Sequence, residues 1–193
     1  MNSVVRNMAA AGDISSDGFR GAMRHLTGGV SVITAGRGKD ITGMTVTSVS
    51  SLSVDPPTLI VSVNREASSW PLLMRHGFFG INILAADQIG IAERFTGKGG
   101  LKGAERFAGG QWTTSVSGVP LLVGALAAID CAVEETIERH SHAIVIGRVL
   151  DILAGGRTAA LAYWQGRYVA VDQDEDAARL AEVSLPLAHA HTR

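Results

Sequence analysis

The sequence predicts a mainly β fold that closes into a barrel and carries a few short peripheral helices. Segments rich in Val, Ile and Thr recur along most of the chain, separated by turns that contain Gly, Pro or Asp. Apolar residues at helical spacing occur only in short stretches. A sheet of many strands with little helix to cover it avoids exposed edges by closing, so a barrel is the expected architecture.

Length and composition indicate one globular domain. The chain has 193 residues, of which 46% are hydrophobic, and no apolar run reaches the roughly 20 residues of a membrane span. We expect the domain to cover residues 16–172. A flexible segment is expected before it, over residues 1–15, and a tail or peripheral helix after it, over residues 173–193.

The amino end, the single cysteine and the charge balance indicate a cytoplasmic protein. Residues 1–13 contain no apolar core of signal-peptide length. Cys131 is the only cysteine, so no intrachain disulfide can form, and its apolar neighbours predict a buried, unreactive thiol. Lysine and arginine total 17 against 18 acidic residues, with no basic stretch, so we expect neither nucleic acid nor a membrane as partner.

The first half of the domain alternates strands with two short helices. Asp17 is expected to cap a helix that ends at Gly28 and Gly29. Ser68 or Ser69 is expected to cap a second helix. Strands are predicted over residues 30–35, 41–53, 58–63 and 78–84.

The second half contains one more helix and the longest strands. Asp87 is expected to cap a helix that the glycine-rich residues 97–103 terminate, and a polar loop then runs to Pro120. Strands are predicted over residues 124–138, 143–153 and 167–171, and a short helix or strand over residues 157–164.

Several kinds of active site lack their sequence signatures in this chain. There is no Walker-type loop, no glycine fingerprint of a Rossmann nucleotide site and no nucleophile elbow. His140 and His142 lie near Glu138 and share a strand-like spacing. Two histidines without a clear third ligand make weak evidence for a metal, so no metal site is predicted.

Residues 43–53, GMTVTSVSSLS, form the first candidate binding feature. A glycine beside small hydroxyl side chains suits a surface where a flat heteroaromatic ring lies against main-chain amides. An ordinary threonine-rich edge strand explains the same stretch, and the residues alone favour that interpretation.

Residues 64–69, NREASS, form the second candidate feature. They leave a buried strand and enter a helix, where free amides, serine hydroxyls and the charge of Arg65 could hold a phosphate. A plain serine cap is an equally good reading. Arg94 ends the next helix, where it could reach the same phosphate or only favour the helix dipole.

Taken in order, the motifs resemble those of the flavin reductase family, the small reductase components of two-component flavin monooxygenases with the FMN-binding split-barrel fold. The match covers nearly the whole core and leaves out only the tail. The segments that carry it are FRGAMRHLTGGVSVIT, GMTVTSVSSLSVDPPTLIVSVN, ASSW, FGINIL, AERFTG, RFAGGQW, GVPLLVGALAAIDCAVEE, HAIVIGRV and LAYWQGRY.

The resemblance implies NADH- or NADPH-dependent reduction of FMN or FAD, and it assigns residues to the site. His142 would position the nicotinamide. The family commonly has Gly-Asp-His here, whereas this chain has His140-Ser141-His142. The residues that would hold the flavin ring, ribityl chain and phosphate are Gly43, Met44, Thr45, Val46, Thr47, Ser48, Val63, Asn64, Ser68, Ser69, Arg94 and Phe95.

The resemblance also implies partners and leaves alternatives open. A homodimer with flavin near the subunit interface is expected, and a flavin-dependent monooxygenase would receive the reduced flavin. The departures at His140 and Ser141 keep open a non-catalytic flavin carrier or sensor of the same fold. A pyridoxine-phosphate-oxidase-like enzyme and a flavin-free barrel are the further alternatives.

Overall fold

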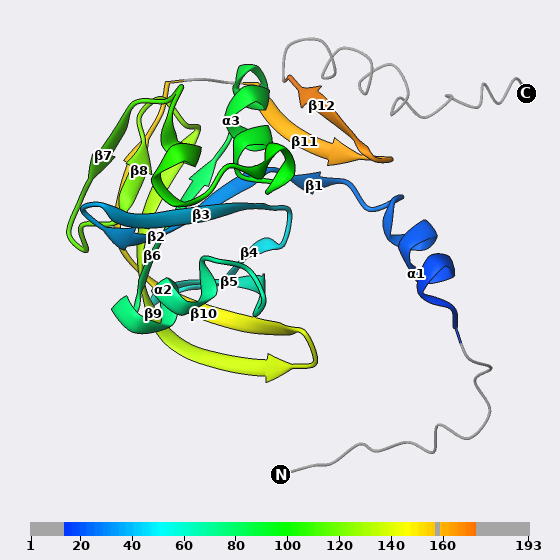
Figure 1. The fold of residues 1–193 in the computed structure, drawn as a ribbon, viewed down its shortest axis with the longest axis horizontal. Helices are drawn as coiled ribbons and strands as arrows, with labels where there is room; N and C mark the ends of the chain where they lie inside the picture. Colours follow the sequence, from blue (N-terminus) through cyan, green and yellow to red (C-terminus); the bar gives the residue numbers. More distant parts are fainter. Residues whose placement is uncertain (1–13, 157–158, 173–193) are drawn as a thin grey trace, which may run out of the picture.

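The computed structural model describes residues 14–156 and 159–172, and the predicted mainly β barrel with short peripheral helices is confirmed (Figure 1). Seven antiparallel strands form the main sheet in the order β3-β2-β6-β9-β10-β5-β4. The strands of this sheet are β2 (Ser31–Arg37), β3 (Asp40–Val46), β4 (Val49–Val54), β5 (Pro57–Asn64), β6 (Phe78–Ile83), β9 (Ala127–Arg139) and β10 (His142–Ala154).

Two smaller sheets and short helices surround the barrel. One sheet has the order β1-β11-β12 and the other pairs β7 with β8. These strands are β1 (Gly28–Gly29), β7 (Trp112–Thr114), β8 (Pro120–Leu122), β11 (Ala160–Trp164) and β12 (Arg167–Val171). The helices are α1 (Ser16–Met23), α2 (Trp70–His76), α3 (Ile89–Arg94) and the 3-10 turns η1 (Ala86–Gln88), η2 (Lys98–Gly100) and η3 (Gly103–Phe107). Within the described residues no helix is long and apolar enough to cross a membrane.

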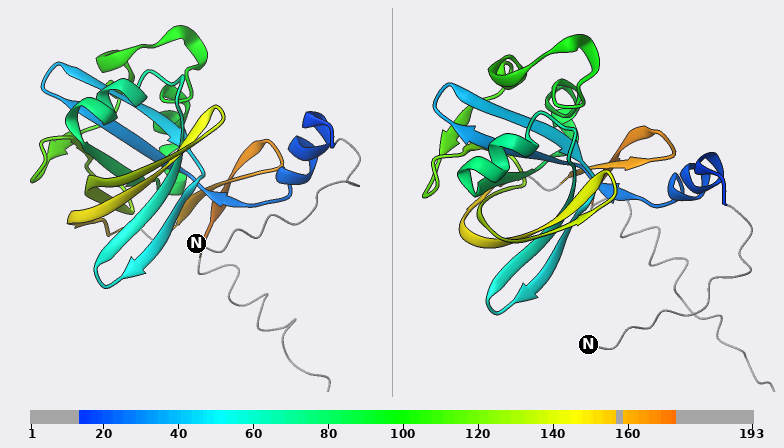
Figure 2. Two further views of the ribbon diagram at one scale, coloured as in Figure 1. Left: turned by 90° about the horizontal axis from the view of Figure 1, so that it is seen from below. Right: turned by 60° about the horizontal axis from the view of Figure 1, so that its bottom comes forward.

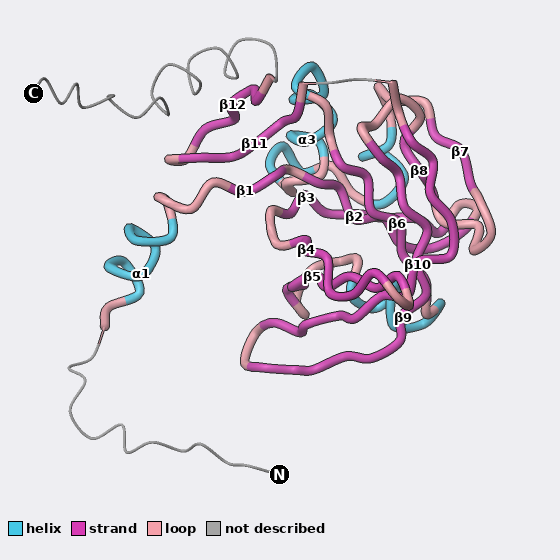
Figure 3. The backbone as a smooth tube through the Cα atoms, turned by 180° about the vertical axis from the view of Figure 1, so that it is seen from behind, coloured by secondary structure: helices cyan, strands magenta, loops and turns pink. Residues whose placement is uncertain are grey.

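The barrel is split between its first and last strands. β3 and β4 lie at opposite ends of the strand order, yet only Thr47 and Ser48 separate them in the chain. The sheet therefore curls until its two edges approach one another, as the tube in Figure 3 illustrates. No ladder joins β3 to β4 among the described residues. The gap leaves backbone groups at this turn without sheet partners.

The central strands are buried on both faces, and each face packs into a different hydrophobic core. Side chains alternate across a strand, so β2 sends Ile33 and Ala35 into the barrel and Val32 to the opposite side. The barrel core also contains Phe79 and Val145. The second core lies beneath α3, η3 and β8, and its members include Leu84, Ile91, Phe95, Phe107, Leu121 and Leu161.

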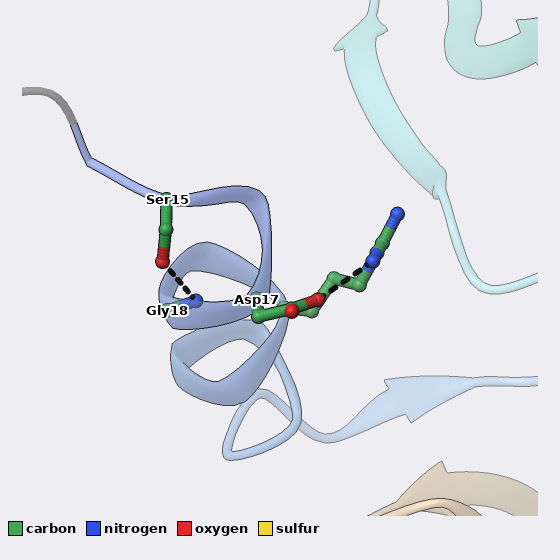
Figure 4. Close-up of polar contacts among 4 residues, drawn as sticks. Ser15, Asp17 and Gly18 are labelled. Atoms are coloured by element: carbon green, nitrogen blue, oxygen red, sulfur yellow. Dashed lines mark hydrogen bonds and ion pairs between the residues drawn. The ribbon is translucent and has the colours of Figure 1, made fainter.

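The cap of the first helix differs from the prediction. Ser15, not Asp17, is the N-cap of α1, and its hydroxyl accepts a hydrogen bond from the amide of Gly18 at 3.0 Å (Figure 4). Asp17 lies in the first turn and pairs with Arg20 at 2.8 Å. The β-region backbone of Ser15 suits a cap, so the helix begins two residues before the predicted position. α1 buries no residue and stands away from the barrel (Figure 2).

Other boundaries also changed. The single strand predicted over residues 41–53 is two strands, because the chain bends at Thr47 and Ser48. Asp87 lies inside η1 and does not cap α3, whose N-cap is Gln88. The polar loop predicted to run to Pro120 contains the short strand β7 and the turn η3, and β8 begins at Pro120; these segments are too short to give an apolar period. Ser69 does occupy the N-cap of α2, but its side chain makes no capping bond.

Some predictions fall where the structure describes little. The flexible segment and tail expected at the two ends lie almost wholly in residues 1–13 and 173–193, outside the described residues. In the ambiguous segment 157–164, residues 157 and 158 are likewise outside, and Ala160–Trp164 is a strand.

Candidate functional site

His142 and Asn64 are direct neighbours across two antiparallel strands. In the ladder between β10 and β5, His142 is opposite Asn64 and Ala143 is opposite Val63. Residues directly opposite in a ladder share a face, with Cβ atoms about 5 Å apart. The imidazole is exposed, whereas the side chain of Val63 is fully buried in the barrel. Val63 can therefore meet a ligand only through its backbone.

The turn between β3 and β4 lies beside the same strand end. The hydroxyl of Ser48 donates a 2.8 Å hydrogen bond to the carbonyl oxygen of Ser62 on β5. Thr47 and Ser48 are exposed, as is His142. Ser62 lies two residues before Asn64, so Ser48 is bonded to the strand whose end pairs Asn64 with His142.

The preceding part of β3 is covered by the segment that follows α3. The amide of Thr45 donates to the carbonyl of Phe95 at 3.1 Å, and the Thr45 hydroxyl donates to the carbonyl of Ala92 at 2.5 Å. The carbonyl of Gly43 accepts from Nη1 of Arg106 at 2.5 Å. These contacts therefore occupy the carbonyl of Gly43 and the amide of Thr45. The more open part of the predicted ring-binding stretch lies at Thr47 and Ser48.

Gly43 is required by packing. A Cβ atom at this position would lie 2.5 Å from the carbonyl oxygen of Ile33 and 2.9 Å from the ring of Phe95. Met44 and Val46 pack against the barrel core instead. The larger side chains of this part of β3 thus face the barrel core, whereas Gly43 lies against Phe95 of the second core.

Ser68 and Ser69 differ in what they can offer a ligand. The hydroxyl of Ser68 is exposed and lies 3.3 Å from the Thr42 hydroxyl. The hydroxyl of Ser69 is buried and has no hydrogen-bond partner among the described residues. A buried hydroxyl without a partner costs about 1–3 kcal/mol, which an incoming phosphate oxygen would offset if residues 67–69 shifted to admit it. Of the two hydroxyls, only that of Ser68 is exposed in this structure.

The charge of Arg65 is already paired. Its Nη2 lies 2.7 Å from Oε2 of Glu138, and its Nη1 donates to the carbonyl of His140 at 3.3 Å. Its amide donates to the carbonyl of Ser141 at 2.9 Å. Arg65 therefore ties the end of β5 to the β9–β10 hairpin and fixes the position of His142, a role that the sequence did not suggest.

Arg94 and Phe95 are not joined to the two serines by any contact in the described part of the chain. Nε of Arg94 donates to the carbonyl of Arg106 at 3.0 Å and Nη2 to that of Glu105 at 2.5 Å. Phe95 is 1% exposed and packs on Phe107, with ring centroids 5.0 Å apart. In this structure Arg94 fastens the η3 turn, and the Phe95 ring presents no surface to a ligand.

A pocket of about 860 Å³ opens beside the turn of the split. Three groups of residues form its wall: the end of β3, the segment from the end of α3 to η2, and the β11–β12 hairpin. They include Thr45, Val46, Thr47, Glu93, Thr96, Lys98, Gly99, Tyr163, Gly166, Arg167 and Tyr168. Lys98 directly follows the AERFTG motif, and the LAYWQGRY motif contains the hairpin turn, but neither had a predicted role in binding.

Another pocket, of about 720 Å³, lies between α3 and residues 109–111. Arg94 and Lys98 line it, but no residue of the predicted ring-binding stretch does. The pocket at the split is therefore the better candidate for the site, because it contains Thr45, Val46 and Thr47.

The remaining candidate groups do not form a reactive centre. Burial, with a smaller contribution from Asp130, raises the pKa of the Cys131 thiol to about 12, so the predicted buried, unreactive thiol is confirmed. Within residues 14–156 and 159–172, no three His, Cys, Asp or Glu side chains gather as metal ligands. Nδ1 of His142 is 2.9 Å from the Ser141 hydroxyl.

Comparison with known proteins identifies related chains. A family model described as flavin reductase like domain matches residues 23–172. FMN reductase (NADH) RutF of Cronobacter sakazakii is 36% identical over 155 residues, which cover 80% of this chain and 92% of the relative.

Two solved structures are also similar. BorF, the flavin reductase component of a bacterial two-component tryptophan halogenase, has a TM-score of 0.76 and 32% identity, covering 82% of this chain and 99% of its own. The styrene monooxygenase flavin reductase SMOB from Pseudomonas putida S12 has a TM-score of 0.70 and 31% identity, covering 79% and 96%.

Proposed function

The chain belongs to the flavin reductase-like domain family, and on that premise we propose that it reduces FMN or FAD with NADH and supplies the reduced flavin to a partner monooxygenase. The observation that carries the proposal is the pairing of His142 with Asn64 at the split of the barrel, on a strand that the turn also contacts through the bond from Ser48 to Ser62. A flat ring placed at this split would meet main-chain groups on one side and an exposed imidazole on another.

The role of the protein is to align two cofactors. A bound flavin supplies the N5 atom that accepts a hydride from C4 of a reduced nicotinamide. Ser141 holds Nδ1 of His142, which leaves Nε2 available to bond a nicotinamide carboxamide. The chain needs no general acid or base for this step, in keeping with the absence of a catalytic triad from its sequence.

We assign flavin binding to part of the set that the family resemblance selected, because the ring of Phe95 and the side chain of Val63 are buried. The backbone of Val46, Thr47 and Ser48 supports the ring, and the hydroxyls of Ser68 and Ser69 contact the phosphate. The partnerless Ser69 hydroxyl supports this assignment. Arg94 would need to contact the phosphate through Nη1, which makes no hydrogen bond in the described residues, because Nε and Nη2 hold η3.

We also propose a homodimer whose interface covers the outer face of β10 and β5. Ala143 and Val145 point into the barrel, so His142 and Ile144 lie on the outer face. Ile144 is 40% exposed, and its strand neighbour Ile146 lies opposite Ile60. An exposed apolar face beside the site is typical of a subunit interface, and it would bring the flavin close to the second subunit.

A cytoplasmic location belongs to the same proposal. The lone Cys131 is consistent with a reducing compartment, and NADH is the electron donor named for the Cronobacter relative.

Steady-state oxidation of NADH by the purified full-length chain tests the proposed function. Activity should require added FMN or FAD and should disappear when flavin is omitted. Repeating the assay with NADPH in place of NADH, and with FMN and FAD in turn, determines which nicotinamide and which flavin the protein prefers. Flavin binding without any NADH or NADPH oxidation would contradict the proposal and favour the flavin carrier that His140 and Ser141 left open.

A further inference from the structure

The pocket at the split extends beyond the predicted flavin contacts. Its wall continues from Thr47 to the segment after α3 and to the β11–β12 hairpin, which lies beside α3 in Figures 1 and 3. Its volume of about 860 Å³ falls within the roughly 300–1,000 Å³ of pockets that take nucleotide-sized ligands. None of the residues on the hairpin side belongs to the predicted flavin set.

Two cations that lack a hydrogen-bond or ion-pair partner in the described residues line this pocket. Lys98 and Arg167 are exposed, and neither side chain makes a hydrogen bond or ion pair within residues 14–156 and 159–172. Arg167 lies 6.0 Å from the ring of Trp164. By contrast, Arg94 and Arg106 are bonded to main-chain carbonyls. Lys98 and Arg167 are therefore the cations still available to an anion here.

The loop that carries Lys98 is built from glycines in left-handed conformations. Gly97, Gly99 and Gly100 have φ values of +81°, +79° and +77°, where any other residue would be strained. Such turns direct successive backbone amides to one side, an arrangement that binds anions. The loop thus adds amide donors next to the Lys98 ammonium.

The hairpin contributes a pair of aromatic rings on the same face. Tyr163 and Tyr168 are opposite each other in the β11–β12 ladder, and their ring centroids are 5.3 Å apart. Both line the pocket, and Tyr163 is 39% exposed. Burial, then the charge of Glu93, then Tyr163 raise the pKa of Tyr168. An exposed aromatic edge suits a purine base, and the Glu93 carboxylate offers an acceptor for ribose hydroxyls.

From these observations we propose that the pocket binds the adenosine diphosphate half of a dinucleotide, with Lys98 and Arg167 contacting its phosphates. Thr47 belongs both to the ring-binding stretch and to this pocket, so a dinucleotide whose redox ring lies at the split extends past Thr47 into it. The inference rests on the proposed function, because NADH and FAD are the two dinucleotides which that function employs. Either one carries this half.

Equilibrium binding of ADP tests the pocket without any redox reaction. Titration calorimetry should find that the full-length wild-type chain binds ADP, and that Lys98→Ala/Arg167→Ala raises its Kd at least about tenfold, since two charge-assisted contacts are lost. Lys102→Ala removes a charge from the same loop but lines no part of this pocket, so its Kd should stay within about twofold of wild type. Thermal melting of the two single variants, Lys98→Ala and Arg167→Ala, shows whether a weaker ADP binding comes from a lost contact or from a less stable fold.

Kinetics with truncated substrates identify which dinucleotide enters. With FMN as acceptor, the double variant should keep its KM for reduced nicotinamide mononucleotide. If NADH occupies the pocket, its KM should rise at least about tenfold with kcat unchanged; if FAD does, the Kd of FAD should rise while that of FMN does not. Either pattern supports the inference.

Three results would overturn it: no ADP binding by the wild type at about 1 mM, unchanged ADP binding in the double variant, or equal losses for mononucleotides and dinucleotides. A chain that binds ADP as expected but oxidises no NADH would contradict the proposed function and would still support ADP binding in this pocket.

Discussion

Replacing His142 by alanine tests whether the protein is a flavin reductase or a flavin carrier without reductase activity. The imidazole is exposed, and its only hydrogen bond in the described residues is that between Nδ1 and the Ser141 hydroxyl. His142→Ala should therefore change the free energy of unfolding by less than about 0.5 kcal/mol. One hydrogen bond to the nicotinamide is at stake, worth about 1.5–3 kcal/mol, so reduction per NADH encounter should fall roughly ten- to a hundredfold.

Stopped-flow reduction of bound FMN at varied NADH measures this loss, and the FMN Kd should remain nearly unchanged. His140→Ala is the matched control, because His140 lies in the same hairpin and contributes only its carbonyl to the contact with Arg65. The control should lose much less activity. An unchanged reduction rate and unchanged NADH affinity in the His142 variant would refute the positioning role.

Three further predictions concern the flavin phosphate, the oligomer and acid stability. Arg94→Ala should weaken FMN binding by about 1.5–3 kcal/mol and spare riboflavin, which lacks a phosphate; equal losses for both would mean that Arg94 acts only by holding Glu105 and Arg106. Light scattering should give a dimer at micromolar concentration, and a monomer would count against the proposed interface. The Ser115 hydroxyl, then a backbone amide, hold the pKa of Asp151 below its usual 3.8, so its ionised form adds stability that is lost as pH falls through the lowered pKa. Urea unfolding should accordingly find Asp151→Asn less stable than wild type at neutral pH, with the difference shrinking in acid; a pH-independent difference would exclude this origin.

The strands were predictable because each buries a recurring run of β-branched residues. β5 and β10, for example, each contain a short apolar run, at residues 59–61 and 143–146, and each follows a turn. The short strands β7 and β8 were not, since Trp112–Thr114 and Pro120–Leu122 depend on tertiary neighbours for their pairing. The bend at Thr47 was missed for a related reason: a Thr- and Ser-rich stretch gives no local signal of where a barrel splits.

The site was predictable only in part. Family resemblance selected His142 and Asn64, which the strand register then places opposite one another. Arg94 had two possible roles at a helix end, and its bonds to carbonyls could not be deduced from its position in the sequence. Lys98 and Arg167 lie far apart in the chain, so only the fold brings them to one pocket.

Anaerobic rapid mixing of the FMN-loaded protein with NADH tests the central claim most directly. We expect the yellow absorbance of oxidised flavin to disappear in a single turnover, and more slowly when the transferred C4 hydrogen of NADH is replaced by deuterium. Flavin that remains oxidised with both NADH and NADPH would contradict it.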